Sequence, residues 1–220
     1  MRAGLVAGLA ALALLLSACS ASFDPTGPCT SDGSAPGAYP DLESIVPKTF
    51  RGSAPGGLDS GRTCSTDGLG TLKGHGIDEL RFAGATWETG DDSGLSLATF
   101  RSEGDTTLTP DWVTEFYETS AKSGKNVESV DSSTYPVATG LVGKRIDVLN
   151  GESYQSVVVW QREGRIEVAL IADFIREIQT KAAHDQVVRE AVDAWLVSDG
   201  LTTIPQGTTP VEGSPAPAPS

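Results

Sequence analysis

Two histidines, His75 and His184, are the side chains best suited to proton transfer in this 220-residue chain. His75 lies between two glycines, which would let a ligand approach it closely, and Asp67 and Asp78 are near enough in sequence to orient its ring. His184 falls near the start of a predicted helix, where a solvated surface position is expected. Neither histidine has a partner at the spacing of a zinc site. His75 is therefore the candidate catalytic residue.

The glycine-rich stretches do not match known nucleotide-binding patterns. Gly68, Gly70 and Gly74 invite comparison with a phosphate loop, but Lys73 stands where the dinucleotide pattern requires glycine. Residues 123–126 lack both the upstream glycine and the hydroxyl residue of a P-loop. No G-x-S-x-G elbow is present, so a serine hydrolase would need a triad assembled from distant segments, and that alternative stays open.

Acidic and aromatic side chains add little evidence of a cofactor. Glu88, Asp91 and Asp92 cluster at a predicted hairpin tip, where they could hold calcium, but their spacing is not that of an EF-hand and a solvated turn is the favoured interpretation. We expect no metal and no cofactor. The tryptophans are expected in the core, with one or two of them as alternative groove-lining residues: Trp87, Trp112, Trp160 and Trp195.

The N-terminus carries an export signal. Arg2 is followed by an apolar run from Leu5 to Leu16, which is too short to span a bilayer. The next residues complete a cleavage site with the sequence Leu16, Ser17, Ala18, Cys19. This site resembles the lipobox of bacterial lipoproteins. The resemblance implies cleavage after residue 18, a diacylglyceryl group on the Cys19 thiol, often acylation of the new amine by a fatty acid such as palmitate, and attachment to a membrane; the alternative is an ordinary secreted protein.

The net charge of the chain and its predicted location limit the kinds of partner that it could bind. Arg2 is the only charged residue of 1–18, so the remaining chain has 15 basic and 29 acidic side chains and a net charge of −14. Nucleic acid is therefore not an expected partner. We also expect anionic lipid headgroups to repel the acidic protein surface, so that the protein does not lie on the bilayer. We predict an extracytoplasmic protein held at the cell membrane by Cys19, or at an outer membrane if the organism has one.

The two remaining cysteines, Cys29 and Cys64, are an even count in an oxidising compartment. We expect them to form a disulfide that joins the N-terminal arm to the folded body. The alternative is two thiols that are inert or redox-active. Closing such a loop stabilises a fold by roughly 3 to 4 kcal/mol in the chain-entropy model.

Composition divides the chain into four parts. Residues 1–18 are the signal, and 19–40, rich in Ser, Pro and Gly, read as a flexible tether. Residues 41–201 are the predicted globular domain, within which the glycine-rich segment 52–76 is not expected to contain a long regular element. Residues 202–220, rich in Pro, Thr and Ala, are predicted to be a disordered tail.

Within the domain, local patterns predict strands and two helices. Two runs, 80–88 and 94–101, read as a hairpin, and a short strand is expected at 127–130. A three-stranded meander follows at 142–149, 154–161 and 166–172. Helices are predicted at 110–121, after the cap and first-turn proline at Thr109 and Pro110, and at 180–197. The fold class predicted is α+β, an antiparallel sheet of hairpin plus meander with both helices packed on one face.

These observations favour a non-enzymatic, lipid-anchored protein whose domain binds a ligand or partner in the cell envelope. One alternative is an envelope hydrolase that uses the glycine-rich loop around His75. Another is an assembly role, in which the sheet face away from the helices would expose an apolar patch.

Overall fold

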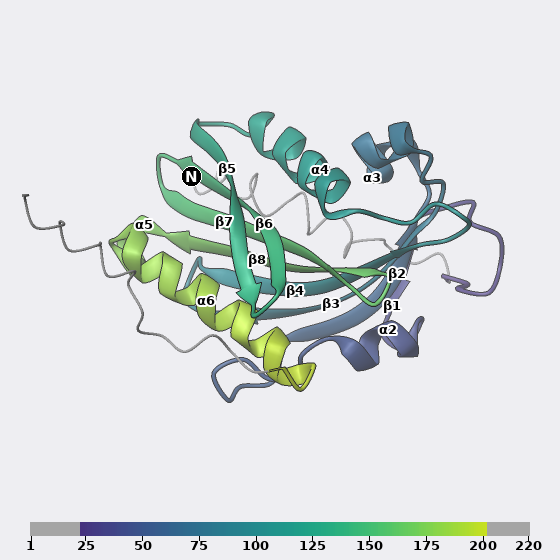
Figure 1. The fold of residues 1–220 in the computed structure, drawn as a ribbon, viewed down its shortest axis with the longest axis horizontal. Helices are drawn as coiled ribbons and strands as arrows, with labels where there is room; N and C mark the ends of the chain where they lie inside the picture. The colour runs from purple at the N-terminus through teal and green to yellow at the C-terminus, as the bar shows by residue number, and fades with distance from the viewer. Residues whose placement is uncertain (1–22, 202–220) are drawn as a thin grey trace, which may run out of the picture.

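The computed structural model describes residues 23–201, which form one antiparallel sheet with helices on both of its faces (Figure 1). The strand order is β1-β2-β3-β4-β8-β7-β6-β5. The strands are β1 (Gly33–Ala35), β2 (Gly57–Thr63), β3 (Leu80–Glu88), β4 (Gly94–Ser102), β5 (Val127–Ala138), β6 (Leu141–Asn150), β7 (Ser153–Arg162) and β8 (Arg165–Phe174). The helices are α2 (Pro40–Ile45), α3 (Thr66–Leu69), the 3-10 helix η1 (Gly70–His75), α4 (Pro110–Lys122), α5 (Ile175–Ile178) and α6 (Lys181–Ser198).

The predicted hairpin and meander are both confirmed as β3–β4 and β6–β7–β8. The strand expected at 127–130 runs on to Ala138, so the meander has four strands. β4 pairs with β8 from Gly94 opposite Ala172 to Phe100 opposite Ile166. This pairing joins the hairpin and the meander into a single sheet.

Both faces of the sheet are buried. On β7, Val157 and Val159 belong to one apolar cluster, whereas Val158 and Trp160 belong to another. Successive side chains of a strand point to opposite faces, so the two clusters lie on opposite sides of the sheet. We call them the α4 cluster and the α6 cluster after the helices that cover them. The α4 cluster contains Val113 and Tyr117 of its helix, and the α6 cluster contains Val187, Val188, Ala191, Val192, Trp195 and Leu196.

The prediction that the two long helices share one face is therefore wrong. α4 lies over one face with α3, and α6 lies over the other with α2 (Figure 1). The unbroken apolar run from Val157 to Trp160 is typical of a strand buried on both sides, which requires a helix on each. The apolar face expected for an assembly role is covered by α4. The core contains three of the four tryptophans that were expected there: Trp87, Trp160 and Trp195.

The N-terminal arm is packed on the domain from Phe23 onward, in contrast to the flexible tether expected up to residue 40. β1 pairs with β2, and the Arg62 guanidinium donates hydrogen bonds to backbone carbonyls of Asp24, Gly27 and Pro28. Phe23 packs edge-on against Tyr39, with ring centroids 6.5 Å apart. Residues 23–40 are thus packed against the domain.

The expected disulfide is present between Cys29 and Cys64, whose Cα atoms are 6.0 Å apart. It fixes the arm to the end of β2. The glycine-rich segment in which β2 lies was not expected to contain a long regular element, yet β2 has seven residues. A Cβ on Gly61 would lie 2.2 Å from the Gly33 carbonyl oxygen and 2.7 Å from the Phe82 ring, so glycine allows the close approach of β1 and β3 here.

α4 begins at Pro110, as predicted, and α6 begins at Lys181, one residue after the predicted start. The Thr109 hydroxyl accepts a hydrogen bond from the Trp112 amide at the start of α4, and the Thr180 hydroxyl accepts one from Ala183 at the start of α6. Among residues 23–201, no helix has the length and apolar character needed to cross a membrane. The predicted signal (1–18), the lipidation site Cys19 and the predicted tail (202–220) lie outside the described residues.

Candidate functional site

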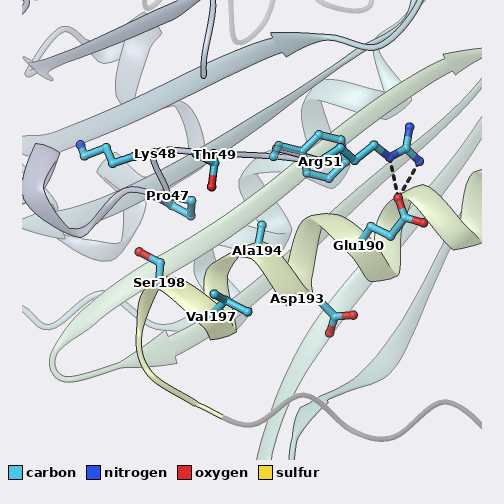
Figure 2. A pocket seen from close by; sticks show the side chains of 10 residues that line it. Pro47, Lys48, Thr49, Arg51, Glu190, Asp193, Ala194, Val197 and Ser198 are labelled. Atoms are coloured by element: carbon cyan, nitrogen blue, oxygen red, sulfur yellow. Dashed lines mark hydrogen bonds and ion pairs between the residues drawn. The ribbon is translucent and has the colours of Figure 1, made fainter. Parts of the chain in front are cut away.

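A groove of about 500 Å³ lies between the segment that follows α2 and the C-terminal half of α6 (Figure 2). We call it the α6 groove. Its apolar lining is Pro47, Phe50, Ala194 and Val197. Its polar lining is Lys48, Thr49, Arg51, Glu190, Asp193 and Ser198. The exposed Val197 side chain, with a relative accessibility of 70%, makes this surface unusual, because large aliphatic side chains elsewhere in the domain are mostly buried.

One wall of the groove is a tight turn centred on Arg51 and Gly52. Phe50 and Ser53 exchange both backbone hydrogen bonds, at 3.0 and 2.9 Å, and the two central residues have φ values of 50° and 78°. Glycine adopts such angles freely, whereas a side chain costs about 1 to 2 kcal/mol there. The indole of Trp87 donates a 3.0 Å hydrogen bond to the Ser53 carbonyl, which fixes the turn to the core.

Arg51 joins this turn to α6. Its guanidinium lies 2.6 Å from the Glu190 carboxylate and 5.1 Å from the centroid of the Phe50 ring (Figure 2). Burial acts to raise the pKa of Glu190, but hydrogen bonds from Gln186 and Arg51 outweigh it, so the pKa lies below its ordinary value. The side chains are 49% and 32% exposed, so an ion pair of this kind contributes about 1 kcal/mol or less.

Asp193 lies one helical turn after Glu190 and differs from it. Within residues 23–201, the Asp193 carboxylate makes no hydrogen bond and no ion pair. Burial raises its pKa, the negative charge of Glu190 raises it further, and Arg189 acts weakly in the opposite direction. The groove therefore contains a half-buried carboxylate that has no ion-pair partner within residues 23–201.

A second polar cluster lies under the N-terminal half of α6. His184, placed on the surface by the sequence, has no exposed area, so that expectation is wrong. Its Nδ1 lies 2.6 Å from the Asp173 carboxylate on β8, and its Nε2 lies 2.8 Å from the Ser156 hydroxyl on β7. The sequence did carry a signal, because Val187 and Val188 follow His184 at helical spacing and share its buried face.

This Ser–His–Asp set has the composition of a hydrolase triad but not its hydrogen-bond directions. The single Ser156 proton has an ionised acceptor in Asp147, at 2.5 Å; burial acts to raise the Asp147 pKa, but bonds from Ser156 and Arg145 lower it overall. The Ser156 hydroxyl therefore donates to Asp147, whereas the serine of a hydrolase triad donates to the imidazole.

Burial leads to the same conclusion. Ser156 has no exposed area, and it lies beneath α6 on a central strand. Arg145 bridges it to Asp185 of α6, while Lys181 lies 2.6 Å from the same Asp185 carboxylate. This cluster, which we call the His184 cluster, joins the first turns of α6 to the sheet.

The other end of α6 is joined to the sheet by a buried carboxylate. Glu167 on β8 has no exposed area; it accepts a 2.6 Å hydrogen bond from the Trp160 indole and lies 2.8 Å from Arg165. Asp199, which caps α6, pairs with Arg162. Burial, and then the charge of Asp199, raises the pKa of Glu167 to about 7.

The structure gives His75 a partner that differs from those considered in the sequence. Its Nε2 lies 2.7 Å from the Glu115 carboxylate of α4, and its ring stacks on Trp112 with centroids 4.6 Å apart. Asp78 is instead 2.5 Å from Lys73. The His75 side chain is 30% exposed. The acid that orients it is therefore Glu115.

The acidic hairpin tip between β3 and β4 is held by α5. The Asp92 amide donates a 3.2 Å hydrogen bond to Glu177, the Ser93 hydroxyl donates one of 2.5 Å to the same carboxylate, and the Asp92 side chain pairs with Arg176. Across the part of the chain that the structure describes, no group of three or more His, Cys, Asp or Glu side chains is arranged to hold a metal ion.

Comparison of the chain with protein-family models, with curated proteins and with solved structures found no significant match. A function for this protein is therefore inferred from the chemistry of its own surfaces. Of the sites described, the α6 groove combines solvent access, apolar surface and a carboxylate that has no ion-pair partner among residues 23–201.

Proposed function

We propose that this protein is a lipid-anchored, extracytoplasmic binding protein, and that the α6 groove is where it holds its ligand or partner. The groove is the observation that carries the proposal. It exposes Val197 beside the Arg51 turn, which is kept in a costly backbone conformation although glycine would relieve it. Such strain in a conformation over-determined by its surroundings is frequent at binding sites.

The anchor supports a location close to the membrane. The lipobox-like residues end at Cys19, and the packed domain begins at Phe23. Four residues of fully extended chain reach at most about 14 Å. A lipid on Cys19 would therefore hold the N-terminal arm, including the Cys29–Cys64 disulfide, near the bilayer surface, at the cell membrane or at an outer membrane if the organism has one.

A photo-crosslinking amino acid at Val197 tests the binding role in intact cells. Val142 on β6 is the matched control, because it is also an exposed valine, with a relative accessibility of 60%, and it does not line the groove. We expect a discrete adduct from position 197 that is missing from position 142. Equal labelling at both positions, or no adduct at position 197, would contradict a binding role for the groove.

A hydrolase using His75 is the second candidate, and the observation that favours it is the Glu115 carboxylate beside the imidazole. Within residues 23–201, no serine or threonine hydroxyl makes a hydrogen bond to His75. One face of its ring is also covered by Trp112. Loss of an envelope hydrolase activity in His75→Ala, but not in Val197→Arg, would favour this candidate over the binding role.

A further inference from the structure

We propose that the occupant of the α6 groove is an extended segment of a partner protein that places a lysine or arginine against Asp193 and an apolar side chain on Val197. This inference rests on the proposed binding role of the groove and names the chemistry of the partner. It follows from the distribution of charge along α6, from the spacing of two residues on that helix, and from the net charge of the chain.

Asp193 is the exception among the carboxylates of α6 and its C-cap. Asp185 pairs with Arg145 and Lys181, Glu190 pairs with Arg51, and Asp199 pairs with Arg162. No such partner reaches Asp193 from any residue of 23–201. A carboxylate that is partly removed from water is stabilised when a cation pairs with it.

The cationic side chains around the groove form no ion pair with Asp193, although the charge of Arg189 acts to lower the Asp193 pKa. Arg189, one turn before it, donates a 2.7 Å hydrogen bond to Gln186. Arg51 is held by Glu190, and the Lys48 ammonium donates to the backbone carbonyl of Glu43. Figure 2 shows the Lys48 side chain extending away from the Arg51–Glu190 pair. A cationic group from outside is therefore the natural partner for Asp193.

The spacing of the acid and the exposed valine indicates an extended chain. Asp193 and Val197 are four residues apart on α6, so their Cβ atoms are neighbours about 5 to 6 Å apart. In an extended segment, side chains two residues apart lie on one face about 6 to 7 Å apart. A basic residue and an apolar residue at positions i and i+2 would therefore meet Asp193 and Val197 together.

Long-range electrostatics act in the same direction. After residue 18 the chain has a net charge of −14, which attracts cationic segments and repels acidic ones. Pro47 and Ala194 line the same groove, and a charge pair formed beside apolar surface would be less screened than one in open water.

A displayed library of random nine-residue peptides, selected on the full chain in detergent, tests the inference. Peptides enriched on the wild type should carry Lys or Arg with an apolar residue two positions away. Binding should fall at least tenfold with Val197→Arg and about fivefold with Asp193→Asn, and it should be unchanged with Val142→Arg. Replacing the basic residue of a selected peptide by norleucine should weaken binding to the wild type but not to Asp193→Asn.

The outcomes separate this inference from the proposed function. Enriched peptides that lack a basic residue, yet lose binding with Val197→Arg, would overturn the cationic partner and leave the groove as the binding site. Peptides that bind Val197→Arg as well as the wild type would overturn both. A selection with no peptide specific to the wild type would also overturn both.

Discussion

The Nδ1 atom of His184 lies 2.6 Å from the Asp173 carboxylate, and both side chains are almost fully removed from solvent. The contact joins α6 to β8 beneath the apolar surface of the helix. Together with the Glu167–Asp199 region at the other end, it fixes the position of α6 on the sheet, and α6 in turn forms one wall of the groove.

Because His184 bridges Asp173 and Ser156 in the buried interior, we expect His184→Ala to lower the free energy of unfolding by about 3 to 5 kcal/mol. Urea unfolding followed by circular dichroism measures this. His75→Ala is the matched control, since its partner Glu115 is half exposed and the loss there should be about 1 kcal/mol or less. Similar losses in the two variants would contradict a structural role for the His184 cluster.

Glu167 should make the protein less stable at alkaline than at acidic pH. Its pKa is about 7 in the folded state, above the ordinary 4.5, so the folded protein binds the proton more tightly than the unfolded chain does. The stabilisation is complete below about pH 4.5 and is lost as the pH rises through about 7. The loss amounts to about 3 kcal/mol at most.

Urea unfolding of the wild type and of Glu167→Gln at pH 5 and pH 8 checks this. We expect the difference between the two pH values to shrink in the variant. Glu128→Gln is the control, because Glu128 is exposed and makes no ion pair within residues 23–201, and it should keep the wild-type difference. An unchanged difference in Glu167→Gln would show that the buried carboxylate does not titrate in this range.

Asp193→Asn should raise the thermal midpoint at pH 7. Burial and the neighbouring charge of Glu190 both oppose the ionised carboxylate, and the amide removes that charge while keeping the shape. Differential scanning calorimetry of the wild type, Asp193→Asn and Glu190→Gln provides the comparison. Glu190→Gln breaks the pair with Arg51 and should not raise the midpoint; a lower midpoint in Asp193→Asn would mean that Asp193 has a stabilising partner.

Reduction of the Cys29–Cys64 disulfide should destabilise the fold by roughly 3 to 4 kcal/mol, because the bond closes a loop with a sequence separation of 35 residues. Thermal unfolding with and without reductant measures the effect. The double variant Cys29→Ser, Cys64→Ser should show the same midpoint as the reduced protein. An insensitive midpoint would show that Arg62 and β1 hold the arm without the disulfide.

Cys19→Ser should release the protein from the membrane fraction. The lipid is the expected anchor, and two or more acyl chains give stable attachment whereas a bare protein surface of net charge −14 does not. Ultracentrifugation of lysed cells and the intact mass of the wild type check this. Equal sedimentation of the two proteins would contradict anchoring through residue 19.

Much of the fold could be predicted from local patterns in the sequence. Thr109 and Pro110 predict the start of α4 because capping and proline geometry act within one turn. The β3–β4 hairpin and the β6–β8 meander follow from strand-forming runs separated by turn residues. β5 was underestimated because the centre of the strand, from Asp131 to Thr134, carries no apolar residue, and its pairing with β6 holds it in place.

The candidate sites were harder to predict from the sequence than the secondary structure was. The type and order of most elements and the Cys29–Cys64 pairing were determined by the sequence, because each depends on neighbouring residues or on a count of cysteines. The export signal with its lipobox-like end stays a prediction from the same kind of local pattern. The tertiary structure alone decided that α4 and α6 lie on opposite faces, that His184 is buried, and that Arg51 reaches Glu190 from 139 positions away while Asp193 has no such partner. These facts depend on which distant side chains meet and how much water they exclude, and neither is encoded in any single stretch of the chain.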